Sequence, residues 1–128
     1  MATDAESVKK RILAIDDENA ICAIYERALE REGYLIETFK NAPDALVRLE
    51  QVSFDLILMD LILQGLNGWD LMRKAKKISP STPIIVVTGR PELDSVVKTM
   101  RMGAYDYLLK PFDIDELLVK VKSGLESK

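Results

Sequence analysis

The sequence predicts a doubly wound α/β domain, in which helices cover both faces of a parallel sheet. Strand-like and helix-like segments alternate five times along 128 residues. The stretches 54–60 and 83–88 are almost continuously apolar, which is typical of strands buried on both faces. The connections are short, and right-handed crossovers between parallel strands then place helices on both sides of the sheet.

Five segments are predicted to be strands. They are rich in β-branched and aliphatic residues, and turn residues flank several of them. Their ranges are 11–16, 34–39, 54–60, 83–88 and 105–109.

Five segments between and after these strands show apolar residues at helical spacing, with one apolar stripe each. The stripes run from Ile21 to Ala28, Ala42 to Leu49, Leu71 to Ile78, Leu93 to Met100 and Ile114 to Val121. On the fourth helix, Asp94 and Lys98 are four residues apart, which predicts an ion pair on its polar face.

The ends of these helices carry recognisable signals. Gly33 and Gly103 are expected to terminate the first and fourth helices, because glycine readily adopts the left-handed conformation found there. Asp113, with Glu116 three residues later, predicts a variant of the capping box at the start of the last helix. Pro91 predicts a well-defined start for the fourth helix, since proline suits the first turn.

The composition is that of one compact domain, with 48% hydrophobic and 30% charged residues. We expect a single domain over residues 1–128, with an ordered core of approximately 10–126. The net charge of −3 and the absence of a basic block argue against direct nucleic-acid binding and against a polybasic membrane anchor. The N-terminal residues do not resemble a signal peptide, and the longest apolar run is interrupted by Asp60. The single cysteine, Cys22, excludes an internal disulfide, so we expect a cytoplasmic protein.

The sequence contains no histidine. This excludes Ser/His and Cys/His nucleophile pairs, histidine metal ligands and a phosphohistidine within this chain. Any chemistry must therefore depend on carboxylates, lysine, hydroxyl groups and bound ions.

Polar residues follow the predicted strands at their carboxyl ends, the edge where doubly wound sheets bind ligands. Asp16 and Asp17 follow the first strand and Asp60 ends the third, while Thr88 and Lys110 come at the ends of the fourth and fifth. Capping of the next helix is the commoner role for a lone Asp-Asp pair, and it is compatible with a role in this crevice. Asp60 ends an apolar strand beside the core, so its carboxylate needs a partner.

Motifs along nearly the whole chain closely resemble those of response regulator receiver domains, the phosphate-accepting domains of two-component signalling. They are ILAIDDE, LILMD, the Asn67-Gly68 pair, IIVVTG and GAYDYLLKPFD, in the order found in that family. The resemblance implies a flavodoxin-like (βα)5 fold with strand order 2-1-3-4-5. That order would make the first and third strands neighbours and bring the three aspartates together.

The resemblance also implies roles for individual residues. Asp60 would be the phosphoacceptor, Thr88 the switch hydroxyl, Tyr107 the switch aromatic and Lys110 the conserved-type lysine of the site. The implied cofactor is Mg²⁺, and its ligands would be Asp17, Asp60 and the backbone carbonyl of Ile62, with Asp16 acting partly through water. A cis bond between Lys110 and Pro111 would turn the lysine towards the crevice.

The expected chemistry is consistent with these residues. An unperturbed aspartate has a pKa of about 3.9 and is ionised at neutral pH, so Asp60 can act as a nucleophile without a general base. Mg²⁺ and Lys110 would balance the charge of three converging carboxylates. Together with the Thr88 hydroxyl, they could hold the equatorial oxygens of the phosphoryl group during transfer.

We therefore expect a histidine kinase or a histidine phosphotransfer protein to phosphorylate Asp60. Phosphorylation would then change the surface of the fourth helix, fifth strand and fifth helix, which would bind an output domain or partner protein or form a homodimer. Charges for that contact would come from Asp94, Lys98, Arg101 and Asp106. We expect no enzymatic activity beyond Mg²⁺-dependent self-phosphorylation and self-dephosphorylation. The stretch 103–118 resembles receivers of enhancer-binding transcription regulators.

Three alternatives remain. A pseudo-receiver would use the same fold for docking without phosphorylation. A phosphatase of the haloacid-dehalogenase type would also form an aspartyl phosphate, but it needs a second aspartate where this chain has Ile62. A flavodoxin-like cofactor carrier is disfavoured, because no Ser/Thr/Gly phosphate loop follows the first strand.

Overall fold

The computed structural model describes residues 9–63, 66–89 and 93–127, and its centre is a five-stranded parallel sheet. The strands are β1 (Arg11–Ile15), β2 (Leu35–Phe39), β3 (Leu56–Met59), β6 (Ile84–Thr88) and β7 (Asp106–Leu109). Their order across the sheet is β2-β1-β3-β6-β7, and every neighbouring pair is parallel. The order 2-1-3-4-5 implied by the sequence is confirmed for these five strands.

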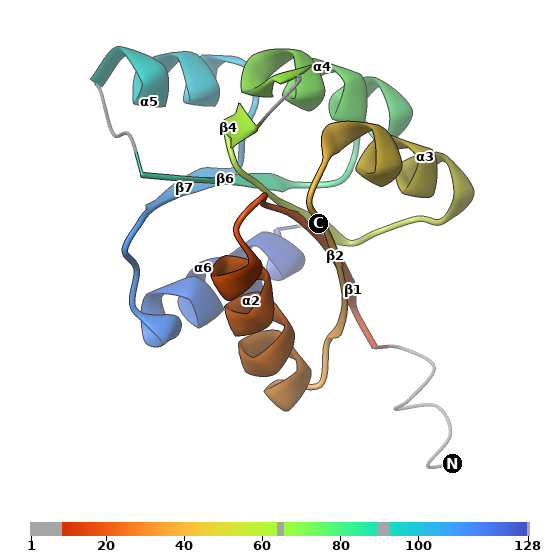
Figure 1. Ribbon diagram of the computed structural model, residues 1–128, viewed down its shortest axis with the longest axis vertical. Coiled ribbons are helices and arrows are strands. Elements are labelled where there is room, and N and C mark those ends of the chain that lie inside the picture. Colours follow the sequence, from red (N-terminus) through yellow and green to blue (C-terminus); the bar gives the residue numbers. More distant parts are fainter. Residues whose placement is uncertain (1–8, 64–65, 90–92, 128) are drawn as a thin grey trace.

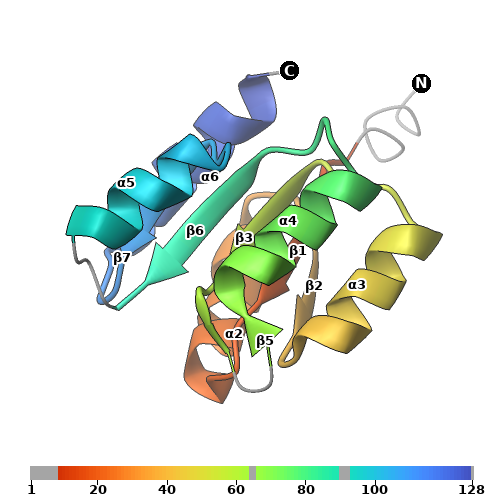
Figure 2. The same ribbon diagram turned by 90° about the horizontal axis from the view of Figure 1, so that it is seen from above.

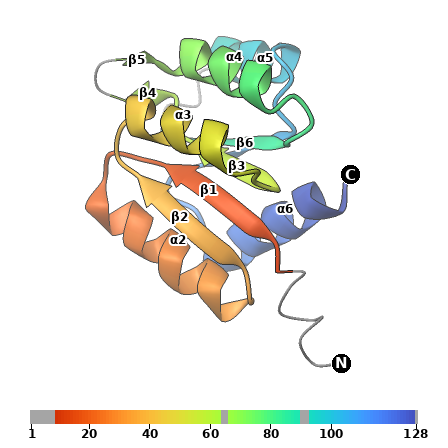
Figure 3. The same cartoon turned by 90° about the vertical axis from the view of Figure 1, so that its right-hand side faces the viewer.

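Helices cover both faces of the sheet, as the alternation of elements predicted (Figure 1). One layer contains α3 (Ala42–Gln51), α4 (Gly68–Ile78) and α5 (Leu93–Arg101), which lie side by side when the molecule is seen from above (Figure 2). The other layer contains α2 (Asn19–Arg31) and α6 (Ile114–Glu126). The side view shows the sheet between the two layers (Figure 3).

The central strand β3 is buried on both faces, which explains its uninterrupted apolar sequence. Ile57 and Met59 belong to the core cluster beneath α3 and α4. Leu56 and Leu58 belong to the cluster beneath α2 and α6, because successive side chains of a strand point to opposite faces. Burial of each such side chain contributes roughly 1.5–3 kcal/mol to the free energy of unfolding.

A small antiparallel hairpin, which the sequence did not predict, lies between Asp60 and α4. It consists of β4 (Ile62–Leu63) and β5 (Leu66–Asn67). The hairpin brings Gly68, the first residue of α4, against the backbone of Leu61, and a β-carbon on Gly68 would overlap that backbone. Glycine is therefore required at this position to let the chain after Asp60 fold back closely.

Two of the predicted helix ends are confirmed, and one predicted cap is wrong. Gly33 and Gly103 have φ angles of +88° and +99°, the left-handed conformation that glycine adopts without strain. Asp113 occupies the N-cap position of α6, but its side chain makes no capping hydrogen bond, so the predicted capping box is wrong. The first residue of α5 is Leu93, and Pro91 lies outside the described residues.

Lys98 contacts the neighbouring helix, and its predicted pairing with Asp94 is not tested. Its Nζ atom lies 3.8 Å from the centroid of the Trp69 ring, which places a cation–π contact between α5 and α4. The side chain of Asp94, the predicted partner, lies outside the described residues. Across the described ranges, no helix has both the length and the apolar character needed to cross a bilayer.

Candidate functional site

The polar residues predicted at the carboxyl edge lie at the ends of four adjacent strands and are fixed by the backbone of the sheet. Asp16 directly follows β1, and Asp60 directly follows β3. The Asp60 amide donates to the Ile15 carbonyl at 3.1 Å, and the Lys110 amide donates to the Thr88 carbonyl at 2.8 Å. The pairing of the strands thus fixes the backbone position from which each of these side chains extends.

Lys110 lies at the centre of the site, surrounded by carboxylates. Its Nζ atom is 2.6 Å from Asp16 Oδ2 and 2.9 Å from both Asp60 Oδ2 and Glu18 Oε2. The Lys110–Pro111 peptide bond is cis, as the sequence resemblance implied. The lysine side chain is only 11% exposed, so its charge depends on these three partners.

Burial and charge act in opposite directions on the ionisable groups of the site. Asp16 is fully buried, and this raises its pKa, although Lys110 and the Glu18 amide, which donates to Oδ1 at 2.9 Å, lower it in part. Burial alone would lower the pKa of Lys110, but its contacts with Asp16, Asp60 and Glu18 outweigh burial and raise the pKa above the usual value. Lys110 is therefore a permanent cation at neutral pH.

Neither aspartate of the Asp16–Asp17 pair is the N-cap of the following helix. That position belongs to Glu18, whose side chain makes no capping hydrogen bond. Asp16 instead accepts from the Glu18 amide with one oxygen, while its other oxygen forms the ion pair with Lys110. The capping interpretation is thus wrong for this pair, and both carboxylates belong to the crevice.

Four carboxylates converge at the crevice, one more than the sequence analysis assigned. Asp16, Asp17, Glu18 and Asp60 each offer an oxygen, and these oxygens all lie within 4.8 Å of one another. A set of hard oxygen donors fits Mg²⁺, which binds through one or two carboxylates with waters and phosphate. Asp16 Oδ2 supports this fit, because it is buried and has no properly oriented hydrogen-bond partner despite the nearby ammonium. Ile62 begins β4 two residues after Asp60, and its carbonyl remains a predicted ligand.

Glu18 was missed because the sequence signal was ambiguous. It is the third acidic residue of ILAIDDE, but a glutamate at the start of a helix is ordinarily explained by the helix dipole. With Glu18 included, four carboxylates face one ammonium, and the formal charge of the cluster is −3.

The two predicted switch residues lie on neighbouring strands. Thr88 is the last residue of β6 and is almost completely buried. Tyr107 on β7 is partly buried and packs against the core cluster beneath α3 and α4. Lys120 of α6 donates to the Tyr107 carbonyl at 2.7 Å and forms an ion pair with Asp106 at 3.2 Å. Asp106, predicted to face a partner, is therefore engaged within the chain.

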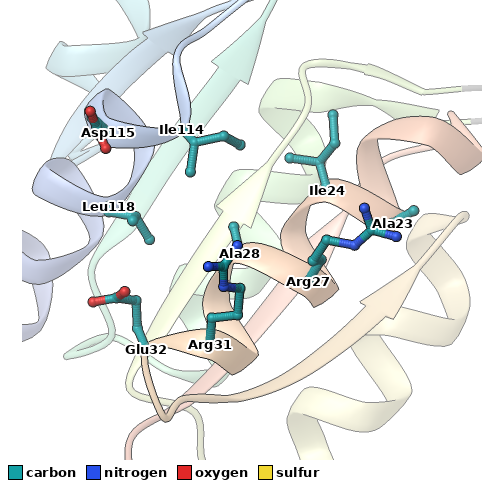
Figure 4. Close-up of a pocket in the computed structure, with 9 residues that line it drawn as sticks. All are labelled: Ala23, Ile24, Arg27, Ala28, Arg31, Glu32, Ile114, Asp115 and Leu118. Atoms are coloured by element: carbon teal, nitrogen blue, oxygen red, sulfur yellow. The ribbon is translucent and has the colours of Figure 1, made fainter.

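A groove of about 510 Å³ runs between α2 and α6. Apolar side chains from the two helices face each other across it, and Arg27 and Arg31 line the α2 side (Figure 4). Both helices begin close in sequence to the site, since α2 follows Glu18 and α6 begins four residues after Lys110. The apolar members are Ala23, Ile24, Ala28, Ile114 and Leu118.

Several known transcription regulators have sequences similar to this one. The DNA-binding transcriptional regulator NtrC of Proteus hauseri is 36% identical over 91% of this chain, which covers 25% of that protein. The transcriptional regulatory protein YkoG of Bacillus subtilis is 34% identical over 91% of this chain and 51% of its own length. The chain thus spans a quarter to a half of these relatives.

Solved structures of receiver domains superpose closely on this one. A CheY-like response regulator receiver domain protein from Methanospirillum hungatei has a TM-score of 0.88 and 37% identity, covering 92% of this chain and 94% of the other. The receiver domain of NtrX from Brucella abortus has a TM-score of 0.85 and 32% identity, covering 91% and 99%. The sequence model described as the response regulator receiver domain matches residues 12–122. The chain therefore belongs to the response regulator receiver domain family of two-component signalling.

Proposed function

We propose that this chain accepts a phosphoryl group on Asp60 from a histidine kinase or a histidine phosphotransfer protein. The observation that carries the proposal is the position of the Asp60 carboxylate, 2.9 Å from the Lys110 ammonium and within the group of acidic oxygens at the carboxyl edge. Its side chain is only 7% exposed, so the groups around it hold the acceptor carboxylate in place.

The reaction is a direct displacement at phosphorus. A carboxylate oxygen of Asp60 forms a bond to phosphorus as the P–N bond of the donor phosphohistidine breaks, and the leaving imidazole takes up a proton. A carboxylate is already ionised at neutral pH, which agrees with the absence of histidine from this chain. Mg²⁺, held by Asp17 and Asp60 with Asp16 nearby, would neutralise charge on the transferred group.

Lys110 and Thr88 stabilise the transferred group after the reaction. Lys110 lies close enough to Asp60 to donate to a phosphoryl oxygen after a small movement of its flexible side chain. Thr88 ends the adjacent strand, and its hydroxyl is the second donor in the proposal. Two or three charge-assisted hydrogen bonds of about 1.5–3 kcal/mol each could supply the ~5.5 kcal/mol that shifts a two-state equilibrium from 1:99 to 99:1.

The groove between α2 and α6 suits the phosphodonor protein, because it presents apolar side chains between charged ones on two helices that begin close in sequence to the site. Ile114 is one of its exposed apolar residues. Ile114→Glu should slow phosphorylation by the kinase without changing phosphorylation by a small donor. Equal rates for the variant and the wild type with the kinase would remove the groove from the proposal.

The output surface in this proposal consists of α5, β7 and α6. Val97, Met100 and Leu109 are exposed apolar residues in this region, which suits an output domain, a partner protein or a second copy after phosphorylation. The curated relatives include transcription regulators, and this chain matches a quarter to a half of their length. Transcriptional output in the cytoplasm is the context that we propose.

The test is intact-mass measurement after incubation with acetyl phosphate and Mg²⁺, with Asp60→Asn as the control. The wild-type protein should gain one phosphoryl group and the variant none, and omission of Mg²⁺ should prevent the gain. An unmodified wild-type protein that is folded would favour a pseudo-receiver. Sustained release of phosphate from unrelated phosphate esters would instead favour a phosphatase, because self-phosphorylation and self-dephosphorylation are the only reactions proposed here.

A further inference from the structure

Glu18 has a side-chain orientation that its position in the helix does not explain. It occupies the N-cap of α2 but makes no capping hydrogen bond. Its side chain is 58% exposed, and yet Oε2 lies 2.9 Å from Lys110 Nζ, a residue 92 positions away in the sequence. The ammonium is therefore the group that holds this glutamate at the mouth of the crevice.

The surroundings of Lys110 make Glu18 different from the other two carboxylates. An ammonium group has three donors, and three carboxylates lie within 2.9 Å of Nζ. Two of these donors bond Glu18 and Asp60, whereas Asp16 Oδ2 is not a well-oriented acceptor, so the release of Glu18 frees a donor for a phosphoryl oxygen. Asp16 is 0% exposed and Asp60 7% exposed, so releasing either would leave a buried charge without its partner. Glu18 is 58% exposed, so its carboxylate can turn into water and be solvated there when it leaves Lys110.

The charge of Glu18 also acts on whatever enters the crevice. It adds a fourth carboxylate to the group that faces a divalent cation. The same charge opposes an approaching anion, and the opposition grows with the negative charge of the phosphodonor.

We propose that Glu18 is a positioning residue and charge gate at the mouth of the site. It holds Lys110 in the unphosphorylated protein and releases it to the phosphoryl group. Its charge strengthens Mg²⁺ binding and discriminates against dianionic small phosphodonors. This inference rests on the proposed function, because it assigns to Glu18 a role in the same phosphoryl transfer.

The decisive variant is Glu18→Gln, which removes the charge and keeps the size of the side chain. Mg²⁺ should bind the unphosphorylated variant about three- to tenfold more weakly than wild type, measured by titration calorimetry with Mg²⁺ alone. At saturating Mg²⁺, the phosphorylation rate with dianionic acetyl phosphate should rise more than the rate with phosphoramidate, which carries less negative charge. The ratio of the two rates should approach the wild-type ratio at high salt, since screening weakens the repulsion.

Two further variants separate this role from a structural one. Glu30→Gln removes an equal charge from an exposed position on the same helix and should leave the Mg²⁺ affinity and the donor ratio unchanged. Glu18→Asp retains the charge and should keep the donor ratio near that of wild type. Thermal melting of all variants shows whether each is folded.

The results separate failure of this inference from failure of the proposed function. If wild type binds Mg²⁺ and is phosphorylated, but Glu18→Gln matches Glu30→Gln in both Mg²⁺ affinity and donor ratio, the role of Glu18 is refuted and the function stands. If wild type neither binds Mg²⁺ nor accepts a phosphoryl group, the proposed function fails and this inference fails with it. A donor ratio in Glu18→Asp equal to that of Glu18→Gln would also overturn the charge gate.

Discussion

Replacing Lys110 by methionine should destabilise the metal-free protein strongly, because the substitution removes the positive charge from the acidic cluster and nearly preserves the volume. Asp16 and Asp60 are almost completely buried and would both lose this cation. Breaking a buried ion pair by removing one partner costs about 3–5 kcal/mol. Glu18 is exposed and can turn into water, so we expect the lower end of this range, about 3 kcal/mol.

The assay is thermal or urea unfolding at neutral pH in the presence of a chelator. For a chain of this size, a loss of about 3 kcal/mol corresponds to a fall in Tm of roughly 10–15 °C. Lys122→Met is the matched control, because Lys122 is exposed on α6, and its stability should stay within about 0.5 kcal/mol of wild type.

Mg²⁺ should reduce the difference between Lys110→Met and wild type. The variant has lost the cation that competes with the metal for the carboxylates, so Mg²⁺ should bind it more tightly. A ligand at about 100 times its Kd stabilises a protein by roughly 2.7 kcal/mol. A variant as stable as the Lys122→Met control, or a destabilisation that Mg²⁺ leaves unchanged, would refute this account of the cluster.

Three further predictions concern other parts of the molecule. Gly68→Ala should lower the free energy of unfolding by about 2 kcal/mol or more and slow phosphorylation. The reason is that the added β-carbon would overlap the backbone of Leu61, the residue after the acceptor. Urea unfolding measures the first effect and intact-mass kinetics the second. Glu37→Gln should destabilise the protein at neutral pH but not in acid, as unfolding measured between pH 7 and 2 should show. The hydrogen bonds of Arg48 hold the Glu37 pKa below its usual 4.5, so the pair contributes stability above that pH. This contribution disappears as the pH falls through the lowered pKa. Tyr107→Ala should leave phosphorylation largely intact but reduce the phosphorylation-dependent change in hydrogen exchange of α5, and an unreduced change would count against Tyr107 as the switch aromatic.

The parts of the site that the sequence predicted are those that depend on strand ends. Asp16, Asp60 and Lys110 follow apolar strands, and parallel pairing brings such positions to one edge whatever the details of the side chains. Glu18 could not be assigned in this way. Its place in the crevice depends on a contact with Lys110 from a distant segment, whereas its local sequence is that of an ordinary helix start.

Local signals were reliable where the backbone alone decides and less reliable where side chains choose between partners. Gly33 and Gly103 end helices as predicted, since the left-handed conformation favours glycine in any context. The capping box at Asp113 did not form, and no local signal indicated the contact of Lys98 with Trp69 of the neighbouring helix. Long polar side chains have several partners within reach, and differences of a few tenths of a kcal/mol decide between them.

The hairpin of β4 and β5 is another feature that the sequence left open. Two-residue strands carry too few residues for a period-2 pattern, so periodicity cannot reveal them. The Asn67-Gly68 pair was noted as a motif, but the reason for its glycine is the close approach to the backbone of Leu61.

By itself, the sequence determined the alternation of elements, the doubly buried central strands and the carboxyl edge at which acidic residues and a lysine meet. Hydrophobic periodicity encodes these features, because burial of apolar surface is additive along the chain and needs no knowledge of distant contacts. The tertiary structure alone decided how the ammonium of Lys110 is shared among Asp16, Asp60 and Glu18. That distribution depends on distances of a few ångströms and on the exposure of each carboxylate, and both are fixed only when segments far apart in the sequence pack together.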